Sequence, residues 1–190
     1  MIDMERYEYA SLIVALTEKL RENQSWAGET HLQKATYVLK RVLGVPIEFK
    51  FILYKHGPFS FDLRDEIGWM RSTRLLEWEV RSNFYGPSLR SGQLSTTLKR
   101  QFPVMPGRYS RQIDFVAQRF GGKNVAALER LTTAIYVTLD EDTPRHERAR
   151  YVNELKPHVS IPEADAALVE ADALIQAAND QFPSAMTACG

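Results

Sequence analysis

The sequence predicts a mainly α-helical protein of the α+β class. It would combine a winged-helix-like unit, which has a small β-hairpin wing, with a C-terminal helical bundle. Apolar residues recur at helical spacing along most of the chain, and strand-like alternation is confined to short stretches near residues 50 and 80. With 190 residues, 44% of them hydrophobic, the chain is long enough to bury a core. We expect the winged unit over residues 1–105, a helical part packed on it over 106–180, and a disordered tail over 181–190.

The first two helices are predicted from their apolar stripes. Ile13, Leu16 and Leu20 share one face of a helix over residues 4–22. The second helix begins near Thr30, and Gly44 ends it because glycine adopts the left-handed conformation with little strain. Its apolar face is formed by Leu32, Ala35, Leu39, Val42 and Leu43.

A strand and a third helix follow. Residues 47–54 alternate between two faces, which is the period of a half-buried strand, and one face consists of Ile47, Phe49, Phe51 and Leu53. The Gly57-Pro58 pair breaks this strand, and Ser60 is a suitable cap for the next helix. We expect the core face of that helix to consist of Phe61, Leu63, Ile67 and Met70.

The next stretch predicts the wing. Trp78 and Val80 alternate with Glu77 and Glu79, which indicates a strand, and residues 94–98 are expected to return as its partner. Turn residues separate the two strands, and the length of the connection predicts a mobile tip. A third helix followed by such a hairpin is the arrangement of a winged helix.

Four more helices complete the expected fold. The fourth covers residues 110–120, and Asn124 caps the fifth, whose regular apolar stripe indicates either core or a partner interface. Pro144 begins the sixth helix. Ser160 and Glu163 match a capping box at the start of the seventh.

Composition limits the functional classes. Lys and Arg together number 24, as do Asp and Glu, so a formal net charge of zero gives no global attraction to nucleic acid or membrane. The single cysteine excludes an intrachain disulfide, and no apolar run approaches a membrane span. We expect a cytoplasmic protein with no cofactor, no metal and no membrane partner.

The charge is uneven beneath this total. No acidic residue lies between Glu79 and Asp114, whereas basic residues recur there beside Phe84, Tyr85 and Tyr109. Such a surface suits nucleic-acid phosphates, and each neutralised phosphate steepens the salt dependence of binding by about 0.9 log units. The alternative is a solvated hairpin with an ordinary charge excess. The candidate nucleic-acid contacts are Arg81, Arg90, Lys99, Arg100, Arg108 and Arg111.

The third helix carries the opposite charge. If this helix were the recognition helix of a winged-helix protein, its three carboxylates would repel the DNA phosphates. This charge argues against sequence-specific DNA binding through the third helix. An acidic helix beside a basic wing favours a protein partner of mixed charge. The candidate protein contacts are Asp62, Arg64, Asp65 and Glu66.

No residue set indicates catalysis. The chain has no Ser-His-Asp order, nucleotide loop or paired-carboxylate spacing, and its four histidines lack metal-ligand spacing. His56 and Asp62 can converge across the Gly-Pro turn near His31, but locally bonded histidines are the simpler interpretation. His158 is expected to pack between two helices. We therefore expect a non-enzymatic protein.

A motif around the second helix and the strand resembles a known family. Its residues are Thr30, Leu32, Gln33, Lys34, Tyr37, Leu39, Gly44, Tyr54, Gly57, Pro58, Ser60, Leu63 and Ile67. The pattern resembles the YwgA-like family of bacterial and archaeal proteins, which is related in pattern to phage-associated Panacea-type antitoxin domains. Later helices at 120–137 and 154–160 are also similar, so the resemblance covers roughly residues 5–178. Val159 stands where that family leads us to expect an aromatic residue.

The resemblance implies a winged-helix-like cytoplasmic protein, often encoded near mobile elements or phage-defence genes, with regulatory or antitoxin roles. It brings no catalytic residues. Two interpretations of its polar motif stay open: ligand or partner contact, or a structural set in which Gln33 bridges backbone groups and Lys34 extends to solvent. The motif residues of unknown role are Gln33, Lys34, Tyr37, Tyr54, Gly57 and Pro58.

Together these observations lead us to expect a regulatory or interaction protein of the antitoxin or defence-accessory kind. It would act by binding a partner protein or nucleic acid. A winged-helix DNA-binding transcriptional regulator is the alternative, and an enzyme with an unrecognised site is a third hypothesis.

Overall fold

The structure is a computed structural model that describes residues 4–82, 85–141 and 143–183. Within these residues the chain is mainly helical with small antiparallel hairpins, as the sequence predicts. The helices are α1 (Met4–Glu22), α2 (Glu29–Arg41), α3 (Phe61–Ser72), α4 (Ser95–Gln101), α5 (Val104–Arg108), α6 (Ser110–Phe120), α7 (Val125–Leu139), α8 (Arg148–Leu155) and α9 (Ile161–Gln181). The strands are β1 (Ile52–Tyr54), β2 (Gly57–Phe59), β3 (Leu76–Glu79) and β4 (Ser88–Ser91).

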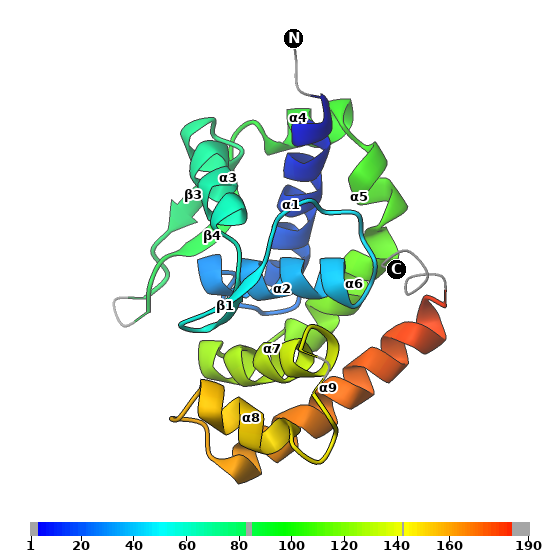
Figure 1. Ribbon diagram of the computed structural model, residues 1–190. Coiled ribbons are helices and arrows are strands. Elements are labelled where there is room, and N and C mark those ends of the chain that lie inside the picture. Colours follow the sequence, from blue (N-terminus) through cyan, green and yellow to red (C-terminus); the bar gives the residue numbers. More distant parts are fainter. Residues whose placement is uncertain (1–3, 83–84, 142, 184–190) are drawn as a thin grey trace.

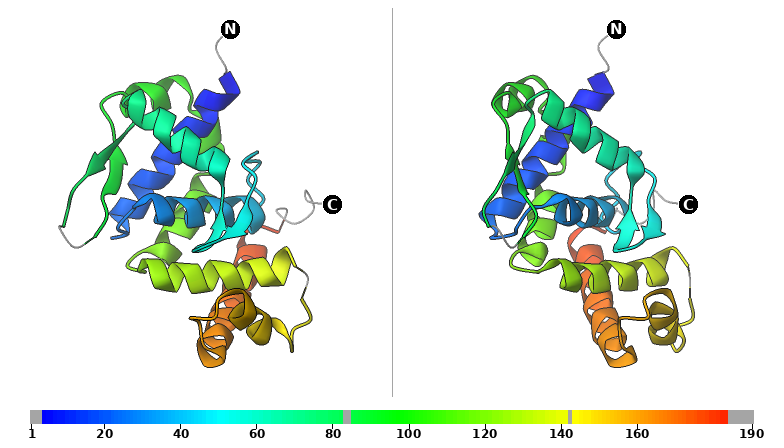
Figure 2. Two further views of the ribbon diagram at one scale, coloured as in Figure 1. Left: turned by 60° about the vertical axis from the view of Figure 1, so that its left-hand side comes forward. Right: turned by 90° about the vertical axis from the view of Figure 1, so that its left-hand side faces the viewer.

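Helix α2 crosses the middle of the molecule (Figure 1). Helices α7, α8 and α9 lie on one side of it, and α1, α3 and α4 lie on the other. The strands form two separate antiparallel hairpins, β1–β2 and β3–β4, which lie at different places along α2 (Figure 2). In the first hairpin Tyr54 pairs with Gly57, and in the second Glu79 pairs with Ser88.

One hydrophobic core joins the two predicted units. It includes Leu12 of α1, Leu39 of α2, and Leu131 with Ile135 of α7. Helix α5 crosses the predicted boundary at residue 105, and the division into two units remains a prediction. A second, smaller cluster joins α7, α8 and α9 and consists of Val137, Val152, Val159 and Ala164.

Local signals set several helix ends as predicted. Ser60 and Asn124 each accept a hydrogen bond from the backbone N–H three residues later, and so they cap α3 and α7. Ser160 and Glu163 form the reciprocal capping box of α9. Gly44, which follows α2, adopts a φ of 63°.

The predicted strand over residues 47–54 is wrong in length, because only Ile52–Tyr54 pairs with another strand. The backbone before it bonds to side chains instead. Lys40 Nζ donates to the Phe49 carbonyl at 2.8 Å, and Asp62 Oδ2 accepts from the Lys50 N–H at 3.2 Å. Residues 47–51 therefore alternate between apolar and charged side chains because every second side chain faces the core, although this segment pairs with no strand that the structure describes.

The wing hairpin is present, but its predicted return strand is wrong. Strand β4 pairs with β3, whereas four of the residues predicted to return, 95–98, lie in α4. Leu98 and Phe102 are both buried, and their separation of four residues is a helical signal. The tip for which mobility is predicted includes residues 83–84, which lie outside the described residues.

Three smaller expectations also need correction. Phe61 lies at the surface at the start of α3, whereas the other predicted core residues of that helix are buried. Helix α8 begins at Arg148 rather than Pro144, because a turn bonded from the Glu147 N–H to the Pro144 carbonyl comes first. Helix α9 continues to Gln181, and residues 184–190 of the predicted tail lie outside the described part.

None of the described helices is both long and apolar enough to cross a bilayer.

Candidate functional site

The polar motif residues of α2 hold the β1–β2 hairpin in place. Gln33 Nε2 donates to the Ser60 carbonyl and Gln33 Oε1 accepts from the Ser60 N–H, each at 2.9 Å. Lys34 Nζ donates to the Pro58 carbonyl at 2.8 Å. The structural interpretation of Gln33 is confirmed. The extension of Lys34 to solvent is wrong, because its side chain is buried and only 1% of the residue is exposed.

The turn of the β1–β2 hairpin packs closely against α7. Gly57 has a φ of +84°, a conformation that favours glycine. A Cβ added there would lie 3.1 Å from Thr133 Oγ1 and 3.3 Å from Thr132 Oγ1. The motif glycine therefore permits both the turn and its close approach to the helix.

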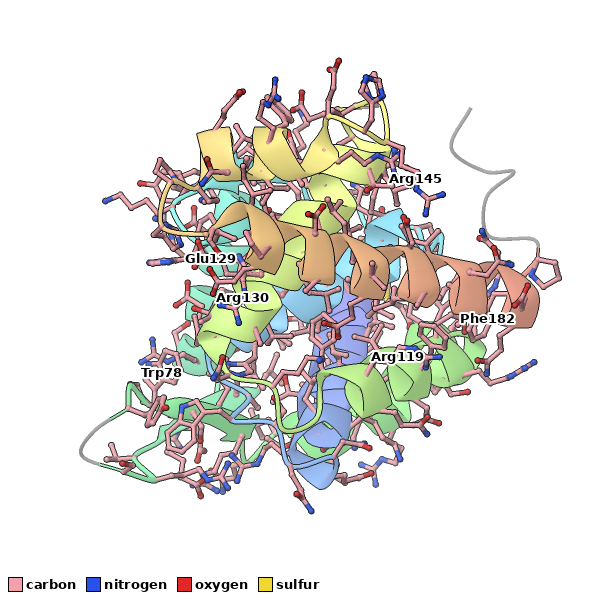
Figure 3. All side chains as sticks on the ribbon, turned by 90° about the horizontal axis from the view of Figure 1, so that it is seen from below. Trp78, Arg119, Glu129, Arg130, Arg145 and Phe182 are labelled. Carbon is pink, nitrogen blue, oxygen red and sulfur yellow. The ribbon has the colours of Figure 1, made fainter. Side chains whose placement is uncertain are left out.

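Three ionisable side chains are buried around the same turn, and we call them the buried charge cluster: Lys34, Glu129 and Lys156. The exposed side chains of His56 and His158 border this cluster. Glu129 is buried on α7, which α9 crosses (Figure 3). Its carboxylate lies 3.2 Å from His56 Nδ1, 3.2 Å from His158 Nε2 and 3.9 Å from Lys156 Nζ. Lys156 Nζ also donates to the carbonyls of Tyr54 and Lys55 at 2.5 and 2.6 Å.

Burial changes the protonation of the two lysines. Desolvation lowers the pKa of Lys34 to about 7, although the negative charge of Glu129 opposes the shift. Desolvation also lowers the pKa of Lys156. A lysine with a lowered pKa is a common catalytic feature, but Lys34 is inaccessible and its amine is bonded to a backbone carbonyl. Its role here is to position the hairpin.

The remaining predicted polar residues have partners that are mostly distant in the sequence. His56 bonds to Glu129, 73 residues away, so the expectation of a locally bonded histidine is wrong. Asp62 bonds to the Lys50 N–H, so the alternative, convergence of His56 with Asp62, is not observed either. The Tyr37 hydroxyl donates to Asp140 Oδ2 at 2.5 Å, and burial raises the pKa of that phenol. Among residues 4–82, 85–141 and 143–183, no group of three or more His, Cys, Asp or Glu side chains forms a metal-binding set.

His31 and His158 occupy different environments. His31 is buried, and its Nε2 lies 3.2 Å from the Lys123 carbonyl. His158 does not pack between helices as expected, because its side chain is 62% exposed while its Nε2 contacts Glu129.

The outer face of the hairpin carries an exposed aromatic patch, which we define as Ile52, Tyr54, Phe59 and Phe61. Ile52, Tyr54 and Phe61 are 47%, 42% and 40% exposed. The three aromatic rings pack on one another, with centroids 5.1 to 5.7 Å apart. Our sequence analysis missed this patch. Its signal was available, since strand alternation places Ile52 and Tyr54 on the same face as the charged residues Glu48 and Lys50.

The four predicted protein contacts of α3 lie at this patch or in the groove beside it. The Arg64 guanidinium lies 5.0 Å from the Phe61 ring centroid and its Nη2 lies 3.0 Å from Asp65. Glu66 pairs with Arg6 of α1 at 2.9 Å. Asp62 follows Phe61 directly and lies on the wall of a neighbouring groove.

That groove runs between α1, α3 and residues 46–50, and we call it the acidic groove. It consists of two hollows of about 810 and 340 Å³, which share Glu5, Tyr9 and Glu48. Burial and the two glutamates raise the pKa of Tyr9 to about 12. The carboxylates that line the groove are Glu5, Glu8, Glu48, Asp62 and Glu66, and they outnumber the basic side chains of its lining, which are Arg6, Lys40 and Lys50.

The predicted nucleic-acid contacts are spread over several elements: Arg81 and Arg90 at the β3–β4 hairpin, Lys99 and Arg100 on α4, Arg108 on α5 and Arg111 on α6. Arg90 pairs with Glu77 at 2.6 Å, and Lys99 pairs with Glu18 of α1 at 2.5 Å. Arg81 lies 3.8 Å from Glu79. Acidic residues from outside the basic stretch thus balance part of its charge, and nucleic-acid contact by this set remains a prediction.

Comparison with known proteins returned no match: no family model, no curated protein and no solved structure matches this chain. The resemblance to the YwgA-like family therefore stays a prediction.

Proposed function

We propose that this protein is a non-enzymatic regulatory protein that binds a partner protein through the aromatic patch and the adjoining acidic groove. One observation carries the proposal: three aromatic rings of the β1–β2 hairpin and the start of α3 pack in tilted and edge-to-face contacts at the surface, while buried polar groups fix the hairpin backbone from behind. Exposed aromatic groups are enriched at the energetic centres of protein interfaces.

The buried charge cluster supports this proposal energetically. A buried lysine and a buried carboxylate each destabilise a fold unless they are bonded. Here Lys34 and Lys156 bond to the carbonyls of Pro58, Tyr54 and Lys55, which are the backbone of the hairpin. These bonds hold the aromatic patch in one conformation before a partner arrives, and such preorganisation reduces the entropy lost on binding.

The chemistry of the partner follows from the surface charge. Five carboxylates and three basic side chains line the acidic groove, which leaves an excess of negative charge, and Asp65 stands at the rim of the aromatic patch. The complementary segment carries apolar or aromatic side chains for the patch and Lys or Arg side chains for the groove.

The sequence resemblance adds a biological setting to the proposal. It suggests the antitoxin or defence-accessory kind of regulator in the cytoplasm, where binding through this face would control the partner's activity.

Selection from a displayed random-peptide library tests the proposal. The library is selected on the wild-type protein, and the enriched peptides are then titrated against a Tyr54→Ser/Phe61→Ser variant. The matched control is Val169→Ser, which changes a residue on α9 that is 70% exposed. We expect peptides that combine apolar and basic residues, and binding that weakens about tenfold or more in the double variant alone.

The carboxylates provide a second comparison. Asp62→Asn/Asp65→Asn should weaken the same peptides and make their binding less sensitive to salt. Circular dichroism verifies that each variant is folded. Failure to enrich any peptide, or equal affinity for the wild-type protein and the Tyr54→Ser/Phe61→Ser variant, would contradict the proposal.

A further inference from the structure

Another hollow, which shares no described lining residue with the aromatic patch or the acidic groove, lies where the β3–β4 hairpin meets the first residues of α2 and α7. It has a volume of about 350 Å³ and is lined by Trp26, Glu29, His31, Trp78, Tyr85 and Val125, among others. A neighbouring hollow of about 190 Å³ shares Trp26, His31, Tyr85 and Val125 with it. Figure 3 shows Trp78 on the hairpin, near the N-terminal end of α7.

Three aromatic rings form the walls of this hollow. The Trp26 and Tyr85 ring centroids lie 5.4 Å apart, and Trp26 Nε1 donates to the Gly86 carbonyl at 2.9 Å. The Arg81 guanidinium lies 5.2 Å from the Trp26 ring, and Arg71 lies 4.6 Å from the Trp78 ring. Since each tryptophan already has its own cation, the rings suit a flat ligand that stacks on them better than a cationic one.

The polar groups of the wall supply both donors and acceptors. Gly28 offers no side chain to cap α2, so the first backbone N–H groups of that helix keep their bonding capacity. A Cβ at Gly28 would lie 3.2 Å from Trp26 Cδ1, and glycine therefore keeps the helix end close to the aromatic wall. Glu29, the first residue of α2, adds a carboxylate acceptor.

His31 adds a second acceptor that has no donor. Its Nε2 lies 3.2 Å from the Lys123 carbonyl, and a carbonyl can only accept, so Nε2 carries the proton. Nδ1 is then an acceptor, and it is buried without a hydrogen-bond partner among the described residues. Since His31 is 2% exposed and burial lowers its pKa, the imidazole is neutral at pH 7.

We propose that this hollow binds a nucleobase, either of a free nucleotide or of a single-stranded nucleic acid. A nucleobase is flat enough to stack on an aromatic ring of this wall, and its edge carries both N–H donors and ring or carbonyl acceptors. The donors face Glu29 and His31, and the acceptors face the N-terminus of α2. An aromatic side chain of a peptide stacks equally well but lacks such a bonding edge.

Calorimetric titration of the full chain with the four common nucleoside monophosphates, and with short single-stranded homopolymers, tests the assignment. The variants are Tyr85→Ala and Trp78→Ala, and the matched control is Tyr54→Ala in the aromatic patch. A Trp69→Phe background leaves Trp26 and Trp78 as fluorescence reporters, because the chain has three tryptophans. We expect saturable binding with tryptophan quenching, weakened about tenfold by Tyr85→Ala and unchanged by Tyr54→Ala.

The two nucleobase sources give different results. Binding of monophosphates supports a free nucleotide, and binding of homopolymers alone supports a single strand. An absence of saturable binding by any of them would overturn the assignment, and so would affinity that neither Tyr85→Ala nor Trp78→Ala reduces. Quenching by an aromatic dipeptide in place of every nucleotide would overturn it in favour of a peptide. Because this site does not include the aromatic patch, the result is independent of the proposed function.

Discussion

The buried amine of Lys34 should make the stability of the fold depend on pH above neutrality. Folding lowers the pKa of Lys34 from its ordinary value of 10.5 to about 7, so between these values the unfolded chain binds more protons than the folded one. The free energy of unfolding rises with pH wherever the unfolded state binds more protons. The penalty for burying the amine is therefore greatest below about pH 7, and it disappears as the pH rises through 10.5.

The size of this change in the free energy of unfolding follows from the single proton that Lys34 binds. A difference of one bound proton changes the free energy of unfolding by about 1.4 kcal/mol per pH unit. Because Lys34 is half protonated in the folded state near pH 7, the rise from pH 7 to pH 9 amounts to about 2 kcal/mol.

Urea unfolding at pH 7, 8 and 9 measures this rise in the wild-type protein and in Lys34→Met. Methionine retains much of the side-chain length but cannot titrate, so we expect the share of the rise from Lys34, about 2 kcal/mol, to disappear, while Lys156, whose pKa burial also lowers, keeps its own contribution. Lys50→Met is the matched control, because Lys50 is exposed and its substitution should leave the rise intact. A Lys34→Met protein that gains as much stability as the wild type between pH 7 and pH 9 would refute the argument from burial.

Two further predictions concern the supports of the hairpin, and urea unfolding at fixed pH measures both. Gly57→Ala should destabilise the protein by about 1–3 kcal/mol, because φ is +84° and the new Cβ would meet Thr133 at 3.1 Å. Gly68→Ala is its control and should stabilise α3 by up to about 1 kcal/mol, since a Cβ there meets nothing within 4 Å. Gln33→Ala should destabilise by about 1–3 kcal/mol, because it leaves the buried Ser60 N–H without its partner, whereas the Ser60 carbonyl keeps the Arg64 N–H. Equal stability of the two glycine variants, or a Gln33→Ala protein as stable as wild type, would contradict these assignments.

Features determined by neighbouring residues could be predicted from the sequence. The caps of α3, α7 and α9 each depend on residues three positions apart, and the apolar stripe of α7 repeats within one helix. Leu128, Leu131 and Ile135 of that stripe are buried in the main core, so the choice between core and interface is resolved for them.

Features that depend on distant residues could not be predicted in the same way. The partner of Lys34 is a carbonyl 24 residues away, and sequence alone gave no reason to prefer it over solvent. The carboxylate of Glu129 contacts His56, Lys156 and His158. His56 and His158 lie in two separate loops, and Lys156 lies at the end of a helix. The predicted basic surface likewise did not include Glu18, because this residue is distant in the sequence. In the folded chain Glu18 of α1 pairs with Lys99 and offsets its charge.

The candidate site was predicted in part. The charged residues of α3 were singled out, and the structure places Arg64, which pairs with Asp65, against the exposed ring of Phe61. The rings themselves were missed, because Phe61 was assigned to the core from its position in a helical pattern. At the first residue of a helix that pattern is weakest, since the preceding turn is not helical.

Site-specific photocrosslinking in the producing cell tests the central claim most directly. A photoreactive phenylalanine analogue replaces Phe61 in one strain and Val169 in another, and crosslinked species are identified by mass spectrometry. We predict a discrete protein adduct at position 61 that is absent at position 169 and is lost when Tyr54→Ser, Asp62→Asn and Asp65→Asn are added. Identical adducts at both positions, or none at position 61, would contradict the claim that this face binds a partner protein.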